Sequence, residues 1–221
     1  MERIQFKKKD LINVVQNLQP FAQPKIKLEQ YTIDALCAVD ITYFAGVEFD
    51  DIRGKMVLDL GVGTGRLSIA SAFLLPKYII GIDIDAEALS ILMENKEGLV
   101  VEGMIHPLCC DVDKIPLEIE SQYTKDSQIT TIMNPPFGVQ KKYADRKFLK
   151  AAMNLSDVIY SIHLASDKVH NFIKNYVKKF GWTIDYVLPY NMIIEGTFPF
   201  HKKDRKQIDV NVYRFLKPFK R

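Results

Sequence analysis

The feature that most restricts the fold of this chain is a short apolar segment that leads directly into a glycine-rich turn. Residues 56–60 are apolar except for Asp59, and a Gly-x-Gly-x-Gly turn at residues 61–65 follows at once. Helical spacing of apolar residues then extends over 66–75 and stops at Pro76. A buried strand, a glycine turn and a helix in this order predict the first unit of a parallel sheet that is covered by helices.

The alternation of apolar segments and helical patterns continues along the chain. Apolar segments that predict further strands lie at 78–82, 104–110, 129–133, 157–163, 182–189 and 208–215. Helical patterns lie at 9–18, 33–44, 86–95, 146–154 and 169–180. We expect Asp10 to be the N-cap of the first of these helices. Since no helical pattern separates the last two strands, we expect them to form an antiparallel hairpin with an exposed, functional loop over 190–207.

Together these elements predict an α/β fold. The expected sheet has seven strands and is mostly parallel, with an antiparallel edge hairpin and helices on both faces. We expect a single domain over residues 1–221, in which residues 1–50 form a helical N-terminal segment and residues 51–221 form the core.

The composition is that of an ordinary globular protein. Of the 221 residues, 48% are hydrophobic and 26% are charged, and the net charge of +3 excludes a polybasic binder. The three cysteines, Cys37, Cys109 and Cys110, have neither a disulfide pattern nor a zinc-ligand spacing, and we expect the adjacent pair to pack in a buried strand. No apolar segment is long enough to span a membrane, and the charged start does not look like a signal peptide. We therefore expect a cytoplasmic protein without a metal site.

Acidic residues at the ends of three successive strands predict a cofactor site. Asp59 precedes the glycine turn, Asp83 ends the second strand and Asp111 ends the third. An acidic group beside the turn disfavours a pyrophosphate and suits a ligand with a positive amino group. A carboxylate at Asp83 can accept hydrogen bonds from both hydroxyls of a ribose, and one at Asp111 can accept from an adenine amino group. An amino acid, a ribose and an adenine together describe S-adenosylmethionine.

A second site is predicted where the fourth strand ends, at Asn134-Pro135-Pro136-Phe137. Two prolines cannot continue a strand, so the strand ends at Asn134 and presents its amide near an aromatic ring. This arrangement suits a flat, polar, aromatic substrate, whereas the alternative is an ordinary strand-ending turn with a buried Phe. In the expected sheet the fourth strand lies beside the first, so the motif faces the methyl donor.

These motifs resemble those of the Rossmann-like, S-adenosylmethionine-dependent methyltransferases with an Asn-Pro-Pro-[Phe/Tyr] motif. More narrowly, the chain is similar to the small methyltransferase-like family that makes N6-methyladenosine in small-subunit ribosomal RNA of eukaryotes and archaea. The resemblance covers nearly the whole chain. Its most specific parts are Leu28-Glu29-Gln30-Tyr31 and Phe200-His201-Lys202-Lys203.

The resemblance implies a cofactor pocket to which the N-terminal segment contributes. Cofactor contacts are implied for Gln30, Gly61, Thr64, Arg66, Asp83, Asp111 and Val112. The ends of the first two strands add Asp59, Gly63, Gly65 and Ile84 to the candidate set. The family usually has Tyr-Pro-Thr after the Gln, but this chain has Tyr31-Thr32-Ile33, and Ile33 has no hydroxyl to offer the cofactor.

The candidate catalytic residues are Asn134, Pro135, Pro136 and Phe137. Our hypothesis is that the Asn134 side-chain oxygen and the Pro135 carbonyl accept the two amino hydrogens of an adenine, while Phe137 stacks on the base. Such a base must be flipped out or already unpaired. Basic residues are candidate RNA contacts, although such clusters are also typical of a solvated surface; they are Lys141, Lys142, His201, Lys202, Lys203 and Arg205.

Three other functions remain open. A protein glutamine-amide methyltransferase would hold a planar amide in the same way, but Phe137 and the short N-terminus disfavour it. A DNA adenine methyltransferase would need a target-recognition domain, for which 221 residues leave no room. A non-catalytic RNA-binding or ribosome-assembly module is disfavoured by the complete set of motifs.

The resemblance also implies two partners, small-subunit ribosomal RNA and a small zinc-binding activator subunit that forms a heterodimer with the methyltransferase. In that family the activator pairs with an edge of the sheet and covers apolar surface. The apolar region around the third strand, 100–110, is the candidate for that edge.

Overall fold

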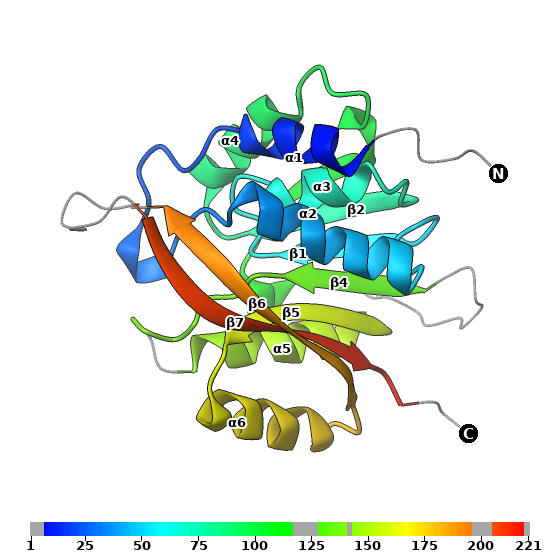
Figure 1. Ribbon diagram of the computed structural model, residues 1–221, viewed down its shortest axis with the longest axis vertical. Coiled ribbons are helices and arrows are strands. Elements are labelled where there is room, and N and C mark those ends of the chain that lie inside the picture. The colour runs from blue at the N-terminus through cyan, green and yellow to red at the C-terminus, as the bar shows by residue number, and fades with distance from the viewer. Residues whose placement is uncertain (1–6, 117–127, 141–142, 196–204, 219–221) are drawn as a thin grey trace.

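The computed structural model describes residues 7–116, 128–140, 143–195 and 205–218, with only the backbone for residues 195, 205 and 206. A seven-stranded sheet lies between two groups of helices (Figure 1). The strands are β1 (Met56–Leu60), β2 (Tyr78–Asp83), β3 (Ile105–Cys109), β4 (Ile129–Met133), β5 (Val158–Leu164), β6 (Thr183–Glu195) and β7 (Arg205–Leu216). The helices are α1 (Lys8–Gln16), α2 (Ala35–Tyr43), α3 (Arg66–Ala72), α4 (Ala86–Lys96), α5 (Ala144–Leu155) and α6 (Asp167–Lys178).

The strand order confirms the fold that the sequence predicts. The sheet runs β3-β2-β1-β4-β5-β7-β6, in which β1 to β5 are parallel and β7 is antiparallel to both of its neighbours. The β6–β7 hairpin therefore forms one edge of the sheet and β3 the other. Because β1 lies between β2 and β4, the chain segments that follow these three strands meet at one end of the sheet.

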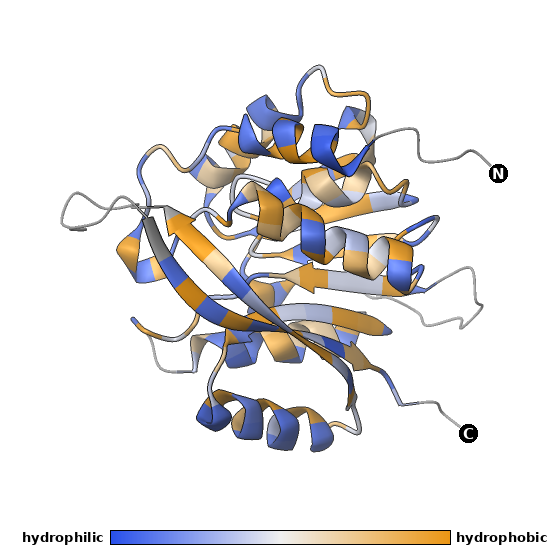
Figure 2. Cartoon of the chain, in the orientation of Figure 1, coloured by the Kyte–Doolittle hydropathy of each residue, from blue (hydrophilic) through white to orange (hydrophobic). Residues whose placement is uncertain are grey.

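Both faces of the sheet are buried, which explains the nearly continuous apolar sequences of its central strands. All five residues of β4 are buried, and so are four of the five in β1. One buried cluster joins the sheet to α1, α2, α3 and α4, and a second joins it to α5 and α6. Figure 2 shows orange colouring at both ends of β4 with a pale middle, in contrast to the largely blue visible side of α6.

Two predictions about element boundaries are wrong. Helix α1 has Lys7 as its N-cap, so Asp10 lies in the first turn, where its carboxylate still faces the positive end of the helix dipole. The segment 190–207, predicted as a loop, continues as strand on both sides: residues up to Glu195 belong to β6, and β7 begins at Arg205. The strand persists because its backbone stays paired in the hairpin and because Met192 is fully buried.

Asn95 of α4 fastens the chain between α1 and α2 to the glycine turn. Its Oδ1 accepts from the Gln19 backbone N–H at 2.7 Å, and its Nδ2 donates to the carbonyls of Gln19 at 3.0 Å and Thr64 at 2.9 Å. The segment that follows Gln19 is thereby held over the end of the sheet where β1, β2 and β4 stop. Within the described residues, no helix has the length and apolar character needed to cross a membrane.

Candidate functional site

A cavity of about 340 Å³ opens at the carboxyl ends of β1, β2 and β4. This volume lies within the roughly 300–1,000 Å³ of pockets for small molecules and cofactors. The walls come from the glycine turn, the ends of β2 and β3, the start of α5, the motif after β4, and the N-terminal segment that crosses above them. These groups are Gly61–Leu67, Asp83 and Ile84, Cys110–Val112, Ala144, Lys147 and Phe148, Asn134 and Pro136, and Phe21 with Lys27–Ile33.

The glycine turn is confined between two phenyl rings. Gly61 and Gly63 have φ angles of 74° and 54°, in the region that favours glycine. A Cβ on Gly61 would lie 3.1 Å from the Phe148 ring, and one on Gly63 would lie 2.8 Å from the Phe21 ring. The Gly61 backbone N–H donates to the Ile82 carbonyl at 2.8 Å. The turn therefore presents bare backbone to the cavity, as a closely held ligand requires.

Asp59 lies beneath the turn and does not line the cavity. Its side chain is 1% exposed, and Ser68 Oγ donates to Asp59 Oδ2 at 2.7 Å. Burial raises the pKa of Asp59 to about 7. Its predicted contact with a positive amino group stays a prediction, since the carboxyl group stands behind the turn.

Asp83 links the end of β2 to the glycine turn. Its Oδ2 accepts from the Gly63 backbone N–H at 2.8 Å, and its Oδ1 accepts from the Asp85 backbone N–H at 3.0 Å. Burial raises the pKa of Asp83. Each oxygen keeps acceptor capacity for a ligand hydroxyl. Ile84 beside it is 51% exposed and lines the cavity, and its predicted cofactor contact stays a prediction.

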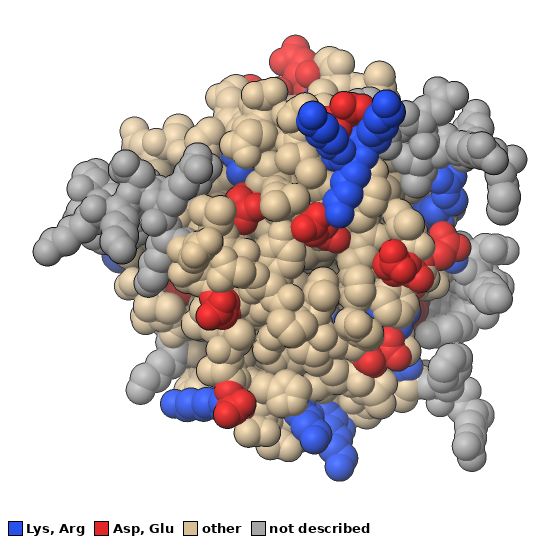
Figure 3. Space-filling view, viewed as in Figure 1, with Lys and Arg blue, Asp and Glu red and all other residues tan. Residues whose placement is uncertain are grey.

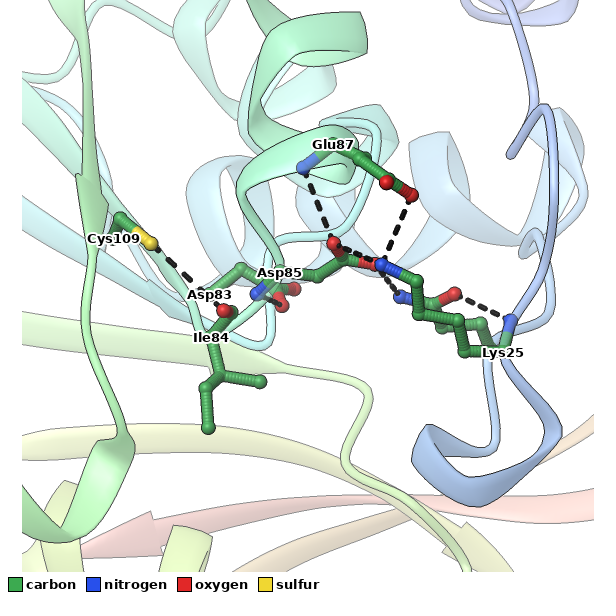
Figure 4. A network of polar contacts seen from close by, with 7 residues as sticks. Lys25, Asp83, Ile84, Asp85, Glu87 and Cys109 are labelled. Atoms are coloured by element: carbon green, nitrogen blue, oxygen red, sulfur yellow. Dashed lines mark hydrogen bonds and ion pairs between the residues drawn. The ribbon is translucent and has the colours of Figure 1, made fainter.

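The N-terminal segment is fastened to the start of α4 by a network around Asp85 (Figure 4). Lys25 Nζ lies 2.7 Å from Asp85 Oδ1 and 3.0 Å from Glu87 Oε2. Gln30 Nε2 donates to Asp85 Oδ2 at 2.7 Å, and Gln30 Oε1 accepts from the Lys25 backbone N–H at 2.7 Å. Burial opposes ionisation of Asp85, but the bonds from Lys25 and Gln30 outweigh it and lower its pKa. Both ends of the Gln30 amide thus hold the segment in place.

Arg66, another predicted cofactor residue, is also used to hold this segment. Its guanidinium donates to the Ile33 carbonyl at 2.7 Å, and the side chain is only 4% exposed. Thr64 is 3% exposed. Both residues line the cavity together with Gly65.

At the third strand end, Asp111 is paired with a lysine that the sequence reasoning missed. Asp111 Oδ1 accepts from the Asp113 backbone N–H and from Lys147 Nζ, both at 3.1 Å. These two partners keep the pKa of Asp111 below its usual value. Val112 is 7% exposed and lines the same cavity as Phe148 of α5. This end of the cavity therefore combines an ionised carboxylate with apolar surface.

The motif after β4 is contacted by the N-terminal segment. The Tyr31 hydroxyl donates to Asn134 Oδ1 at 3.1 Å, and the rings of Tyr31 and Phe137 are stacked with centroids 5.3 Å apart and 29° between planes. Burial raises the pKa of Tyr31, so its hydroxyl remains a donor. Pro135 is buried, and Pro136 lines the cavity.

Glu29 holds the loop that follows this motif. Its Oε2 accepts from the Gly138 backbone N–H at 3.1 Å, and its Oε1 accepts from the Gln140 backbone N–H at 2.8 Å. Glu29 has a left-handed backbone with φ of 53°, which is uncommon for a residue other than glycine. One short stretch, Glu29 to Tyr31, thus contacts both the cofactor-side network and the strand end.

Other polar groups near the sheet have structural partners. His163 is 2% exposed, and its Nε2 lies 2.7 Å from Ser161 Oγ; burial lowers its pKa to about 3, so the ring is neutral. Cys109 is exposed, which makes its predicted packing in a buried strand wrong, because β3 is an edge strand. Among the described residues, no group of three or more His, Cys, Asp or Glu side chains could hold a metal ion.

The predicted RNA contacts are only partly visible. Lys141, Lys142, His201, Lys202 and Lys203 lie outside the described residues, and of Arg205 only the backbone, at the start of β7, is described. On the face seen in Figure 3, basic side chains form small groups near acidic ones. These predictions therefore stay predictions.

Several wall residues were not predicted as site residues, among them Phe21, Tyr31, Lys147 and Phe148. The sequence signal that could have identified Lys147 and Phe148 as site residues was their position near the start of the helix that follows the fourth strand. For Phe21 and Tyr31 no local pattern marks the contact, because their partners lie far away in the sequence.

The chain is similar to known proteins over most of its length. Residues 42–125 match the family model described as Ribosomal protein L11 methyltransferase (PrmA), which spans less than half of the chain. The rRNA N(6)-adenosine-methyltransferase METTL5 of Danio rerio is 35% identical over 211 residues, 95% of this chain and 98% of the relative. An uncharacterized protein of Methanocaldococcus jannaschii is 39% identical over 214 residues, 96% of this chain and 94% of the relative.

A solved structure is similar over the same extent. The crystal structure of a Pyrococcus horikoshii protein, provisionally described as an RNA methyltransferase, superimposes with a TM-score of 0.85 at 36% identity. The superposition covers 97% of this chain and 100% of that one.

Proposed function

This chain belongs to the family of the rRNA N(6)-adenosine-methyltransferases METTL5, which are S-adenosylmethionine-dependent methyltransferases, and from that premise we propose that it forms N6-methyladenosine in small-subunit ribosomal RNA. The observation that carries the proposal is the position of Asn134. Its side-chain oxygen lies at the end of β4 beside the cavity and already accepts a hydrogen bond there from Tyr31. Phe137, whose ring lies next to that bond, provides a surface for an aromatic base.

The cavity fits the cofactor of this family. The turn at Gly61 and Gly63 offers backbone where a Cβ would collide with Phe148 or Phe21, so a ligand can approach closely. Asp83 faces the cavity with acceptor capacity for ribose hydroxyls, and Asp111 with capacity for an adenine amino group. When bound, S-adenosylmethionine supplies an electrophilic methyl group on a positive sulfur.

The residues after β4 prepare the nitrogen that receives this methyl group. The exocyclic nitrogen of adenine is a weak nucleophile, because its lone pair is delocalised into the ring. Asn134 Oδ1 and the Pro135 carbonyl accept its two hydrogens and so favour a more tetrahedral nitrogen whose lone pair points to the cofactor side. Phe137 stacks on the base and fixes its plane, a contact worth about 1–3 kcal/mol in nucleic-acid binders. Holding donor and acceptor in line supplies much of the rate.

The reaction does not need a strong general base. The amino nitrogen becomes cationic on methyl transfer, so its proton is lost easily afterwards. His163 is not suited to take that proton, because its ring is buried and its Nε2 is engaged with Ser161.

RNA binding is the second part of the proposal. The basic residues Lys141, Lys142, Lys202, Lys203 and Arg205, with His201, contact phosphates next to the target adenine. The target base enters unpaired or flipped out of its helix. In this proposal residues 1–221 act as one methyltransferase domain, in which residues 1–50 complete the cofactor pocket.

We also propose the heterodimer with a small zinc-binding activator subunit that the family resemblance implies. Two features support it: among the described residues β3 pairs with β2 alone, which leaves its other side open, and Val100 just before it is 88% exposed. Pairing of a partner strand with β3 would cover both. Co-expression with such a subunit should raise solubility and activity, and a chain that is monodisperse and equally active alone would contradict the heterodimer.

The function is tested by transfer of a radiolabelled methyl group from S-adenosylmethionine to ribosomal RNA fragments. We expect label in N6-methyladenosine with the wild-type chain and a loss of about 100- to 1,000-fold with Asn134→Ala, the size seen when one key hydrogen-bonding group is removed from an active site. Calorimetry should show unchanged cofactor binding in the variant. Label in a protein fraction would instead indicate an amide methyltransferase. The absence of cofactor binding would refute the proposal that the chain is a methyltransferase.

A further inference from the structure

Tyr31 makes two of the three contacts that the proposed function assigns to the target adenine. Its hydroxyl donates to Asn134 Oδ1 at 3.1 Å, where an adenine amino hydrogen would donate. Its ring stacks on Phe137 at a centroid distance of 5.3 Å, within the 4.5–7 Å of favourable aromatic pairs. A base that donates to Asn134 from the same side and stacks on the same face of Phe137 would occupy the space of the Tyr31 ring.

We infer that Tyr31 is a placeholder for the target base, so that Tyr31 and the base exclude each other at Asn134 and Phe137. This inference rests on the proposed function, because it takes the Asn134 oxygen as the acceptor for the base. Tyr31 is accordingly a positioning residue: its side chain must turn away before methyl transfer, and it takes no part in the chemical step.

The placeholder gives Asn134 a defined orientation before the base arrives. A side-chain amide has one accepting and one donating end, and only the oxygen can accept from a tyrosine hydroxyl. The Tyr31 hydroxyl is held as a donor because burial keeps it protonated. The amide oxygen therefore already faces the side on which the base will bind, and no rotation of Asn134 is needed at that step.

The movement is restricted to the Tyr31 side chain, because its neighbours are fastened on both sides. Glu29 holds the backbone N–H groups of Gly138 and Gln140, and Gln30 is tied to Asp85 and to the Lys25 backbone. Beyond Tyr31, the Ile33 carbonyl accepts from Arg66. The Tyr31 ring itself is only half-buried and lines the cavity, so rotation about its side-chain bonds gives it a way out.

Two possible roles of Tyr31, as a competitor of the base or as a fixed wall beside it, predict opposite effects of its substitution on base affinity. If Tyr31 gives way to the base, removing its contacts strengthens the binding of every base by the same factor, because the cost of displacing Tyr31 is common to all. If Tyr31 instead stays as a second wall beside the base, the same substitutions weaken binding.

The test measures the affinity of adenosine 5′-monophosphate and inosine 5′-monophosphate for the full chain by calorimetry. Saturating S-adenosylhomocysteine is present, which blocks the adenine subsite of the cofactor and prevents turnover. We expect Tyr31→Phe, which loses only the hydroxyl, to bind adenosine 5′-monophosphate about 2- to 10-fold more tightly, the value of one neutral hydrogen bond. Tyr31→Ala should add about another 2- to 10-fold, because the ring stacking is lost as well.

Inosine 5′-monophosphate is the matched probe, because its base has a carbonyl where adenine has the amino group. It should bind more weakly than adenosine 5′-monophosphate to every variant, and it should gain by the same factor when Tyr31 is changed. Tyr186→Phe is the control variant, since Tyr186 lies in β6 and is 46% exposed. It should leave both affinities unchanged.

A second readout follows Tyr31 directly. In chain labelled with 3-fluorotyrosine, the ¹⁹F resonance that disappears in Tyr31→Phe should shift on addition of adenosine 5′-monophosphate. On a ribosomal RNA fragment, Tyr31→Phe should lower KM more than it changes kcat. The placeholder is overturned if both Tyr31 variants bind adenosine 5′-monophosphate equally or more weakly, or if the resonance does not move at saturation.

Failure of the placeholder can be told apart from failure of the proposed function. Wild-type chain that methylates ribosomal RNA, with Tyr31 variants that do not bind the nucleotide more tightly, refutes the placeholder alone. Wild-type chain that transfers no methyl group to RNA and binds neither nucleotide refutes the proposed function and the placeholder together.

Discussion

The two sides of the cavity are built in different ways. On the cofactor side, the glycine turn is held by the strand next to it: Gly63 N–H donates to Asp83, only 20 positions away, and Gly61 N–H donates to Ile82. On the base side, the contacts of Asn134 and of the following loop come from Tyr31 and Glu29, which lie 103 and 109 or more positions earlier. The glycine turn is held by the sheet itself, whereas the contacts of Asn134 and of the loop after it form only once the N-terminal segment has docked.

The largest expected effect comes from the third glycine of the turn. Gly65 has a φ of 94°, and a Cβ there would lie 2.1 Å from Leu92 Cδ1. Gly65→Ala should lower the free energy of unfolding by about 2 to 5 kcal/mol, the sum of left-handed backbone strain and overpacking. Urea unfolding measures this change.

Gly98→Ala is the matched control for that substitution. Gly98 also has a positive φ, of 72°, but a Cβ there would meet no atom within 4 Å. It should cost only about 1 to 2 kcal/mol, from the backbone alone. Equal losses in the two variants would show that the packing of the turn against α4 adds nothing.

The next effect is a pH dependence from Asp59, on the cofactor side. Its pKa in the folded protein is raised by burial to about 7, against an ordinary value of 3.8. Between these values the folded protein binds more protons than the unfolded chain, so stability should fall as the pH rises from about 4 to 7 and should level off above that. At about 1.4 kcal/mol for each pH unit between the two pKa values, the fall amounts to a few kcal/mol. In Asp59→Asn, measured by urea unfolding at the same pH values without cofactor, this slope should become smaller, with the raised pKa of Asp83 contributing the rest. An unchanged slope would contradict the raised pKa of Asp59.

A smaller effect is expected on the base side from Glu29→Gln. The carboxylate accepts from two backbone N–H groups, whereas the amide can accept with only one of its ends. Loss of one charge-assisted bond should lower kcat/KM on ribosomal RNA about 10-fold without changing cofactor affinity. Glu87→Gln, at an exposed partner of Lys25, is the control and should leave kcat/KM unchanged. A loss of cofactor affinity in Glu29→Gln would contradict the view that the base side and the cofactor side of the cavity are held independently.

The smallest effect should come from Lys147→Gln. Lys147 and Asp111 are about one-third exposed, and their ion pair spans 3.1 Å. Exposed pairs of this kind contribute at most about 1 kcal/mol, and Asp111 keeps its bond from the Asp113 backbone. Calorimetry should show cofactor affinity reduced less than about 10-fold. Complete loss of binding would mean that Lys147 itself contacts the cofactor.

Much of the fold could be predicted because its signals are local. Apolar segments that end in Asp83 or in Asn134-Pro135 mark strand ends, and the Gly-x-Gly-x-Gly pattern marks a turn whose glycines have positive φ in the structure. Boundaries were harder: Asp10 resembles an N-cap in sequence, and the residues from Asn191 to Glu195 continue the strand into the predicted loop, with Met192 fully buried. The hairpin is stable there because each strand supplies the other's hydrogen bonds, which no local pattern reveals.

The candidate site divides in the same manner. Residue types and spacing along the chain were enough to identify the strand-end carboxylates and the Asn-Pro-Pro-Phe motif, because a strand directs its last side chains to one edge of the sheet. The partners of those side chains depend on the folded arrangement alone. Asp59 turned out to be buried behind the turn and bonded to Ser68, and Tyr31 to be placed on Asn134, because such contacts join residues that only the packed chain brings together.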